Sequence, residues 1–165
     1  AGAVLNREMT MTGCRNSGSI SCKFNGTTNR NVRIGGIVGM SYKALTMTDC
    51  HNTGSVTQLN SKNTEYLGGL VGQVEQNLTT NFSNCSVNSV ITPAKTTFPY
   101  AGLVGGRVTD KSTGRTNTTI SGVTVSGTFA GVEITSENYG TYTFGTSSDY
   151  GKISGHETTG ITFAE

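Results

Sequence analysis

Apolar residues along this chain occur in short, often β-branched runs that are separated by clusters of Gly, Asn and Ser. Short apolar runs between such turn residues are typical of many short β-strands. A thin β-structure needs few apolar residues in each turn, because its core is only a narrow column. The pattern therefore predicts an all-β chain with few or no helices.

The chain contains an internal repeat, which is the strongest indication of its fold. One glycine-rich segment occurs at residues 34–39, 67–72 and 100–105. The steps from Gly36 to Gly69 and from Gly69 to Gly102 are both 33 residues. A second segment lies between these copies, at residues 10–20, 46–56, 81–91 and 119–129.

Alignment of the second segment gives three mainly apolar columns. They are Met11, Met47, Phe82 and Ile120; Cys14, Cys50, Cys85 and Val123; and Ile20, Val56, Ile91 and Phe129. In a solenoid each repeat forms one coil, and equivalent residues stack at the strand spacing of about 4.8 Å. Apolar columns then become internal ladders, whereas an antiparallel β-sandwich, the alternative fold, does not explain the constant spacing.

We therefore predict one parallel β-solenoid domain over residues 1–165, right-handed because parallel crossovers nearly always are. Four to five coils are expected. The repeats should lie at about 9–39, 45–72, 80–105 and 118–145, with a divergent C-terminal cap at 146–165.

The repeat resembles the GLUG motif, named for its Gly-Leu-x-Gly core. The matching residues are 36–39, 69–72 and 102–105, together with the segment 49–54, Asp-Cys-His-Asn-Thr-Gly. The resemblance covers roughly residues 9–129 and implies a β-solenoid from large secreted or surface proteins of bacteria, including gut Bacteroidetes. It implies no particular activity, because the family has no common one.

Composition narrows the classes of partner. A net charge of +2 with 13% charged residues gives no basic stripe for nucleic acid. No apolar run approaches the length of a membrane span. The chain opens with Ala1, so we expect a piece of a larger extracellular or cell-surface protein, monomeric as a domain and without a cofactor.

Candidate metal and catalytic residues are few. Three of the four cysteines share one column, and these are Cys14, Cys50 and Cys85. A shared column favours free thiols that point inward over a disulfide between coils or a zinc site. His51 and His156 are expected to be solvated, and His51 has no Ser or Cys partner at a motif spacing. Among the acids, Asp49 alone lies in a strand-like segment. No acid recurs in a column, so no catalytic site is predicted.

Two surfaces are candidate ligand sites. The first flanks an apolar column with outward hydroxyl side chains, which form either a passive face or an array that orders water, as in ice-binding solenoids. Its residues are Thr10, Thr12, Thr46, Thr48, Ser83, Thr119 and Ser121, interrupted by Asn81. The second is the basic loop with Arg107, Lys111 and Arg115, which could contact an acidic glycan.

Tyrosines are a further candidate, as an aromatic platform for sugars formed by Tyr66, Tyr100, Tyr139 and Tyr142. Tyr100 aligns with Ile34 and Leu67, which favours a core role for it. The resulting functional hypothesis is a non-catalytic, adhesin-like or stalk-like module that binds a glycan or a host or microbial surface protein. A glycan-processing β-helix enzyme and an ice-binding solenoid are the alternatives.

Overall fold

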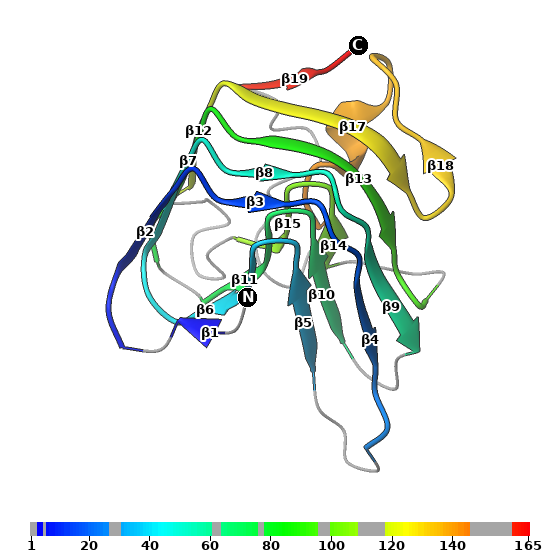
Figure 1. The fold of residues 1–165 in the computed structure, drawn as a ribbon, viewed down its shortest axis with the longest axis horizontal. Coiled ribbons are helices and arrows are strands. Elements are labelled where there is room, and N and C mark those ends of the chain that lie inside the picture. Colours follow the sequence, from blue (N-terminus) through cyan, green and yellow to red (C-terminus); the bar gives the residue numbers. More distant parts are fainter. Residues whose placement is uncertain are drawn as a thin grey trace.

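The computed structural model describes residues 3–4, 6–26, 31–60, 64–75, 78–95, 100–108, 118–145 and 160–165. In this part of the chain the regular structure is almost entirely β, and the strands of successive repeats pair in parallel (Figure 1). The one helical element among these residues is a 3-10 turn, η1 (Tyr139–Tyr142). The predicted all-β, parallel solenoid is confirmed. No helix in the described residues is long and apolar enough to cross a membrane.

Each complete coil contributes strands to four stacked sheets, named here by a strand of the second coil. The β7 sheet contains β2 (Met9–Thr12), β7 (Leu45–Thr48), β12 (Thr80–Ser83) and β16 (Thr118–Ser121). The β8 sheet contains β3 (Arg15–Asn16), β4 (Ile20–Lys23), β8 (His51–Asn52), β9 (Val56–Asn60), β13 (Ser86–Thr92) and β17 (Val123–Phe129). The β10 sheet contains β5 (Val32–Gly35), β10 (Glu65–Gly68) and β14 (Ala101–Gly102). The β11 sheet contains β1 (Ala3–Val4), β6 (Val38–Ser41), β11 (Val71–Val74) and β15 (Gly105–Arg107).

The stack has about three turns, fewer than the four to five that the repeat predicted. The fourth copy supplies β16 and β17 and then leaves the path of the coils. Strand β18 (Val132–Glu133) turns back antiparallel on β17, and β19 (Ile161–Phe163) pairs with β17 in parallel. The end of the fourth repeat therefore belongs to a cap, which a bridge between Phe144 and Gly105 joins to the stack.

The core is the set of columns that the repeat predicted. Two of them pair residue by residue across the sheets, and these are Met11, Met47, Phe82 and Ile120, and Ile20, Val56, Ile91 and Phe129. Their central members are fully buried. Each large apolar side chain buried in this way contributes about 1.5–3 kcal/mol to stability.

A left-handed corner follows the β7-sheet strand in every coil. Gly13, Asp49, Asn84 and Gly122 occupy it with φ of 69°, 51°, 51° and 62°. A Cβ atom is disfavoured in this conformation, and Asn and Asp are the side chains that tolerate it best after Gly. Asp49, which the sequence placed in a strand-like segment, is thus a corner residue, and its side chain is exposed.

The repeated glycine segment brings two sheets into backbone contact. A Cβ atom on Gly35 would lie 2.0 Å from the carbonyl oxygen of Val38, and one on Gly72 would lie 2.8 Å from the backbone of Ile34. These distances are shorter than real Cβ contacts, so the turn between the β10 and β11 sheets can close only around glycine.

The third copy of this segment is shifted by one residue. Leu67 pairs with Ile34, an offset of 33 residues, but with Ala101 in the next coil, an offset of 34. Gly69 consequently lies against the carbonyl of Leu103, and the expected stacking of Gly69 on Gly102 is wrong. The shift also places Tyr100 beside Tyr66, whereas the sequence alignment placed it beside Leu67.

The left-handed corner makes a direct prediction about stability. Replacing Asn84 with Val should lower the free energy of unfolding by about 1–2 kcal/mol, because a β-branched residue is strained at positive φ. Replacing Asn84 with Gly should be tolerated. Ser83→Val, one residue earlier in extended β12, is the matched control and should be close to neutral. Equal losses for Asn84→Val and Ser83→Val in urea denaturation would contradict the corner's role.

Candidate functional site

The predicted hydroxyl face exists as a regular two-row array on the outside of the β7 sheet. One row is Thr10, Thr46, Asn81 and Thr119, and the other is Thr12, Thr48, Ser83 and Ser121. All eight side chains are partly or fully exposed, while the residues between them point into the core. Asn81, the interruption in the first row, donates a hydrogen bond from Nδ2 to Thr46 Oγ1 at 3.2 Å. The structure therefore brings all seven predicted hydroxyl residues together.

The predicted basic loop is not supported at the one residue that the structure describes. Arg107 ends strand β15 and is buried, with 7% of its surface exposed, so it is no part of an exposed loop. Its register neighbour in the β11 sheet is Gln73, which is also buried. Lys111 and Arg115 lie outside the described residues.

Arg107 instead belongs to a cluster of arginine and tyrosine side chains, here called the Arg–Tyr cluster. Its members are Arg33, Tyr66, Tyr100 and Arg107. The Tyr66 and Tyr100 rings have their centroids 5.0 Å apart at 35°. The guanidinium carbons of Arg33 and Arg107 lie 5.5 Å and 5.9 Å from the Tyr66 ring centroid, within the range of a cation–π interaction.

Local structure explains why these four side chains meet. Arg33 and Tyr66 pair in register across β5 and β10, and the one-residue shift brings Tyr100 onto the same row. Arg33 also donates from Nε to Gln73 Oε1, which ties the row to the β11 sheet. Tyr66 is buried, whereas Arg33 and Tyr100 are partly exposed, so a ligand can reach the outer part of the cluster.

His51 has a partner that the sequence analysis missed. His51 is partly exposed on the outer face of the β8 sheet, as expected, but its Nδ1 lies 2.6 Å from Ser86 Oγ, a serine at no motif spacing from it. Stacking of coils brings the two together, and a motif search along one segment does not reveal such pairs. The register neighbour on the other side of His51 is Arg15, which has no acceptor to orient the ring as a catalytic triad would. His156 lies outside the described residues.

All four cysteines are free thiols, and they fall into two pairs by exposure. Cys14 and Cys22 are partly exposed, while Cys50 and Cys85 are buried. Burial raises the pKa of the Cys50 thiol from 9.0 to about 11, and burial also raises the pKa of Cys85. Among the described residues, no group of three or more His, Cys, Asp and Glu side chains could hold a metal ion.

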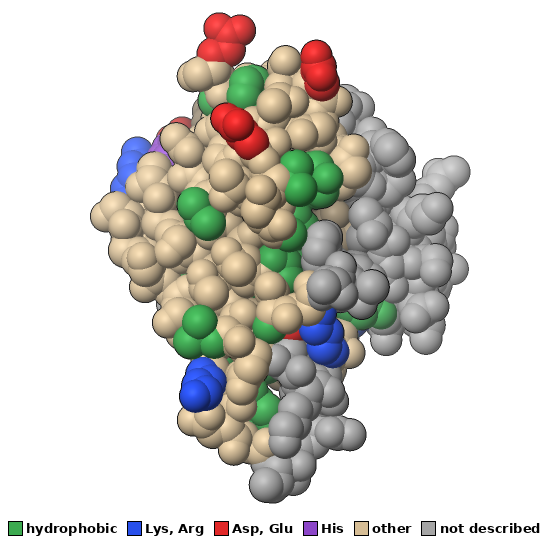
Figure 2. All heavy atoms as spheres, turned by 90° about the vertical axis from the view of Figure 1, so that its right-hand side faces the viewer, with side chains coloured by type: hydrophobic (Ala, Val, Ile, Leu, Met, Phe, Trp, Pro, Cys, Tyr) green, Lys and Arg blue, Asp and Glu red, His purple; other side chains and the backbone are tan. Residues whose placement is uncertain are grey.

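Two open pockets lie at the C-terminal cap. One of about 410 Å³ lies between the cap residues Glu133, Phe163 and Glu165 and residues of β13 and β17, and both carboxylates are exposed. The other, of about 390 Å³, lies between Lys95, Val132 and Tyr142. In the view of Figure 2 the backbone and the uncharged polar side chains cover most of the described surface, and most of the acidic side chains in view lie at the end of the stack that carries the C-terminus.

A buried polar ladder is a further feature that the sequence analysis missed. Asn16 Nδ2 donates to Asn52 Oδ1 at 2.8 Å, and Asn52 Nδ2 donates to Ser89 Oγ at 3.3 Å. Asn52 Oδ1 also accepts the backbone N–H of Gly54 at 3.0 Å. Because each amide serves both its own turn and the next coil, this ladder has a structural role and offers no open site.

These features define a repeat protein of the parallel β-solenoid class. Residues 63–92 match the family model described as the GLUG motif, which agrees with the resemblance seen in the repeat and is consistent with a GLUG-motif repeat protein. The match runs from just before β10 to the end of β13, so it spans parts of two coils. No curated protein and no solved structure matches the chain significantly.

The two classes of cysteine should differ in reactivity. At about pH 8 a thiol reagent should modify Cys14 and Cys22 in the folded protein but reach Cys50 and Cys85 only after denaturation, because the thiolate is the reactive form. Mass spectrometry of the modified peptides identifies the sites. Equal rates at Cys14 and Cys50 would contradict the buried column.

The raised pKa of Cys50 also predicts how the stability of the protein depends on pH. Between pH 9 and pH 11 the folded protein holds the Cys50 proton more tightly than the unfolded chain, so the free energy of unfolding should fall as the pH rises. Cys50→Val, which introduces the residue of the fourth copy, should flatten this part of the profile relative to the unchanged protein.

Proposed function

We propose that this chain is a non-catalytic repeat module of an extracellular or cell-surface protein, adhesin-like or stalk-like, and that it binds acidic glycans at the Arg–Tyr cluster. The observation that carries the proposal is the stacking of Tyr66 and Tyr100 together with two guanidinium groups. The extracellular setting rests on the resemblance to GLUG-motif proteins.

The chemistry of the cluster suits an acidic sugar. A guanidinium group binds a carboxylate or sulfate through paired N–H donors, and a tyrosine ring packs against the apolar face of a pyranose. Arg33 and Tyr100 are the partly exposed members, so they are the residues proposed to touch the ligand. Tyr66 and Arg107 are buried behind them and are proposed to hold the exposed pair in place.

Rigidity supports the same proposal. Arg33, Tyr66 and Tyr100 lie on or beside β5, β10 and β14, which pair in parallel, and Arg107 lies on β15, which pairs in parallel with β11. Side chains held on strands lose little conformational entropy on binding, so even a small contact area can give useful affinity.

The proposal predicts a defined loss of binding. An array of neutral and acidic oligosaccharides should retain the protein on uronate or sulfated glycans, with weaker binding at high salt. In titration with an oligo-uronate, Arg33→Ala should weaken binding about tenfold or more, since a charged hydrogen bond contributes about 1.5–3 kcal/mol. Tyr100→Ala should also weaken binding, because the ring that packs against the sugar is lost.

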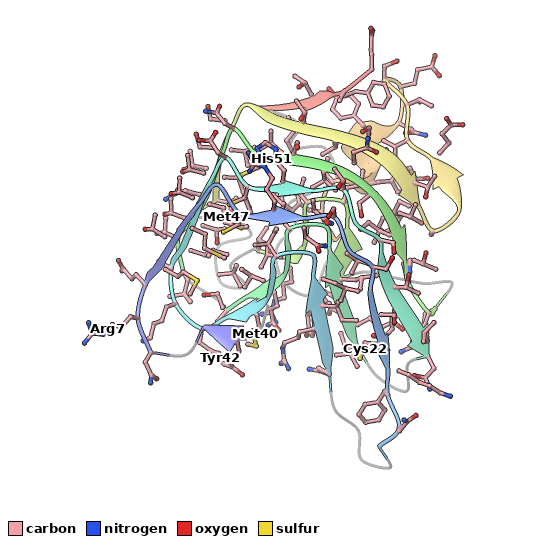
Figure 3. All side chains as sticks on the ribbon, in the orientation of Figure 1. Arg7, Cys22, Met40, Tyr42, Met47 and His51 are labelled. Atoms are coloured by element: carbon pink, nitrogen blue, oxygen red, sulfur yellow. The ribbon has the colours of Figure 1, made fainter. Side chains whose placement is uncertain are left out.

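Conservative variants and a distant variant complete this test. Tyr100→Phe should retain most of the affinity, and Arg7→Ala should retain all of it, because Arg7 projects from the far edge of the molecule (Figure 3). Unchanged affinity in Arg33→Ala and Tyr100→Ala would reject the site. Release of new sugar ends from the oligo-uronate would instead support the glycan-processing alternative and direct attention to Glu133 and Glu165.

Ice binding is a second candidate function, favoured by the two in-register rows of the hydroxyl face. Strand pairing fixes the spacing between successive side chains at about 4.8 Å along each row, which gives a periodic surface. A lattice of ordered water can match such a surface, whereas an irregular polar face cannot.

The hydroxyl face can be tested by inhibition of ice recrystallisation. If the face binds ice, the unchanged protein is active, and Thr46→Tyr and Thr48→Tyr each abolish activity by disrupting the regular array. Thr57→Tyr, at an outward position of β9 away from this face, is the matched control and should remain active. An inactive unchanged protein would leave the hydroxyl face as a passive surface.

A further inference from the structure

We propose that the N-terminal end of the stack is a docking surface for one more coil of the same repeat, connected to the chain through β1. The first observation concerns two equivalent glycines. A Cβ atom on Gly54 would lie 2.0 Å from the carbonyl oxygen of Gly18, so Gly54 must be glycine because a coil lies on its N-terminal side. Gly18 holds the same position one coil earlier, and a Cβ atom there would meet only Asn16 Oδ1, at 3.7 Å.

In the described structure no atom would clash with a side chain at position 18, so steric contacts do not explain why this residue is glycine. Its φ lies outside the left-handed region, so backbone conformation does not explain the glycine either. A further coil stacked in the same register would place its own carbonyl oxygen where a Gly18 side chain would point. Gly18 has the same short turn as Gly54, whereas Ser89, the equivalent residue of the third coil, lies in the continuous strand β13 and accommodates a side chain there.

The core columns end unfinished at the same place. Leu45, Met47, Cys50 and Val56 are fully buried in the second coil, but their equivalents Met9, Met11, Cys14 and Ile20 are partly exposed. The thiols show the same difference. Cys50 and Cys85 donate to Met11 O and Met47 O of the preceding coil at 3.6 Å and 3.4 Å, whereas Cys14 contacts Thr12 O of its own coil at 4.0 Å.

Strand β1 marks the path that such a coil would follow. Ala3 pairs with Met40 and Val4 pairs with Ser41, so β1 lies against β6 in the same way as β6 lies against β11. It is the fourth side of a coil whose other three sides would cover β2, β3 with β4, and β5. The chain enters the stack already in the register of this coil.

A second copy of the chain fits this end less well. The exposed cations Arg7, Arg15 and Lys23 lie in the terminal coil against one exposed carboxylate, Glu8, so two N-terminal ends would bring like charges together. The opposite end is closed on the β8 sheet, because β17 is already paired with β18 and β19. A parallel coil with apolar inward residues and a single connection to β1 meets neither obstacle.

The test adds such a coil to the whole chain. A copy of residues 45–72 is placed directly before Ala3, so that Ala3 takes the position that Gln73 has after Gly72. The extended protein should fold with a single unfolding transition. Its Cys14 should react with a thiol reagent at least about tenfold more slowly than in the original chain, because the new coil covers it. A scrambled version of the added segment should leave Cys14 reactive.

The effect of Gly18→Ala on the Tm provides a second readout, which is independent of the reactivity of Cys14. In the original chain Gly18→Ala should leave the Tm almost unchanged, while Gly54→Ala should lower it by several degrees. In the extended chain Gly18→Ala should become as damaging as Gly54→Ala. A reactive Cys14 together with a harmless Gly18→Ala in the extended chain would overturn the proposal. So would a dimer of the original chain that Gly18→Ala dissociates, because the occupant would then be a second copy.

Discussion

The structure depends on one constraint, which is parallel backbone hydrogen bonding between coils in a fixed register. The three complete coils pair with one another through all four sheets, so a strand side chain of the middle coil has its equivalents directly above and below it. A residue type can therefore occupy a whole column only if its side chains pack well when they are stacked at the strand spacing. Apolar residues satisfy this inside the stack, and amides satisfy it where Asn16, Asn52 and Ser89 form a hydrogen-bonded ladder.

The same constraint explains how much of the fold could be predicted from the sequence. The columns through Met47 and Val56 were visible because an apolar residue in one coil requires an apolar residue in the next. The hydroxyl face followed automatically, since alternation along β7 turns Thr46 and Thr48 outward once Met47 is inward. The left-handed corner at Asp49 and Asn84 was harder to predict, because Asp and Asn are common in many kinds of turn and loop and not only at left-handed positions.

The candidate site was harder to predict, for reasons that are also physical. A constant spacing of the glycine segments suggested that Tyr100 continues the Leu67 column, but a shift of one residue moves a side chain to the other face of a strand. Tyr100 therefore joins Tyr66, and no local pattern signals this. The contact of His51 with Ser86 and the burial of Arg107 likewise depend on which coil lies adjacent, and this is set by the lengths of the connecting segments.

A strict repeat limits the kinds of binding site that such a molecule can form. A column that is the same in every coil, like the hydroxyl face, can present a periodic surface but not a convergent pocket. Convergence needs different side chains on neighbouring coils, and this occurs where the repeat changes. Arg33 and Tyr66 occupy equivalent positions, the shifted Tyr100 extends their row, and Arg107 replaces the amide of Gln73 one coil later. The Arg–Tyr cluster exists because the third coil departs from the other two, and that departure is the physical reason for placing the proposed glycan contact there.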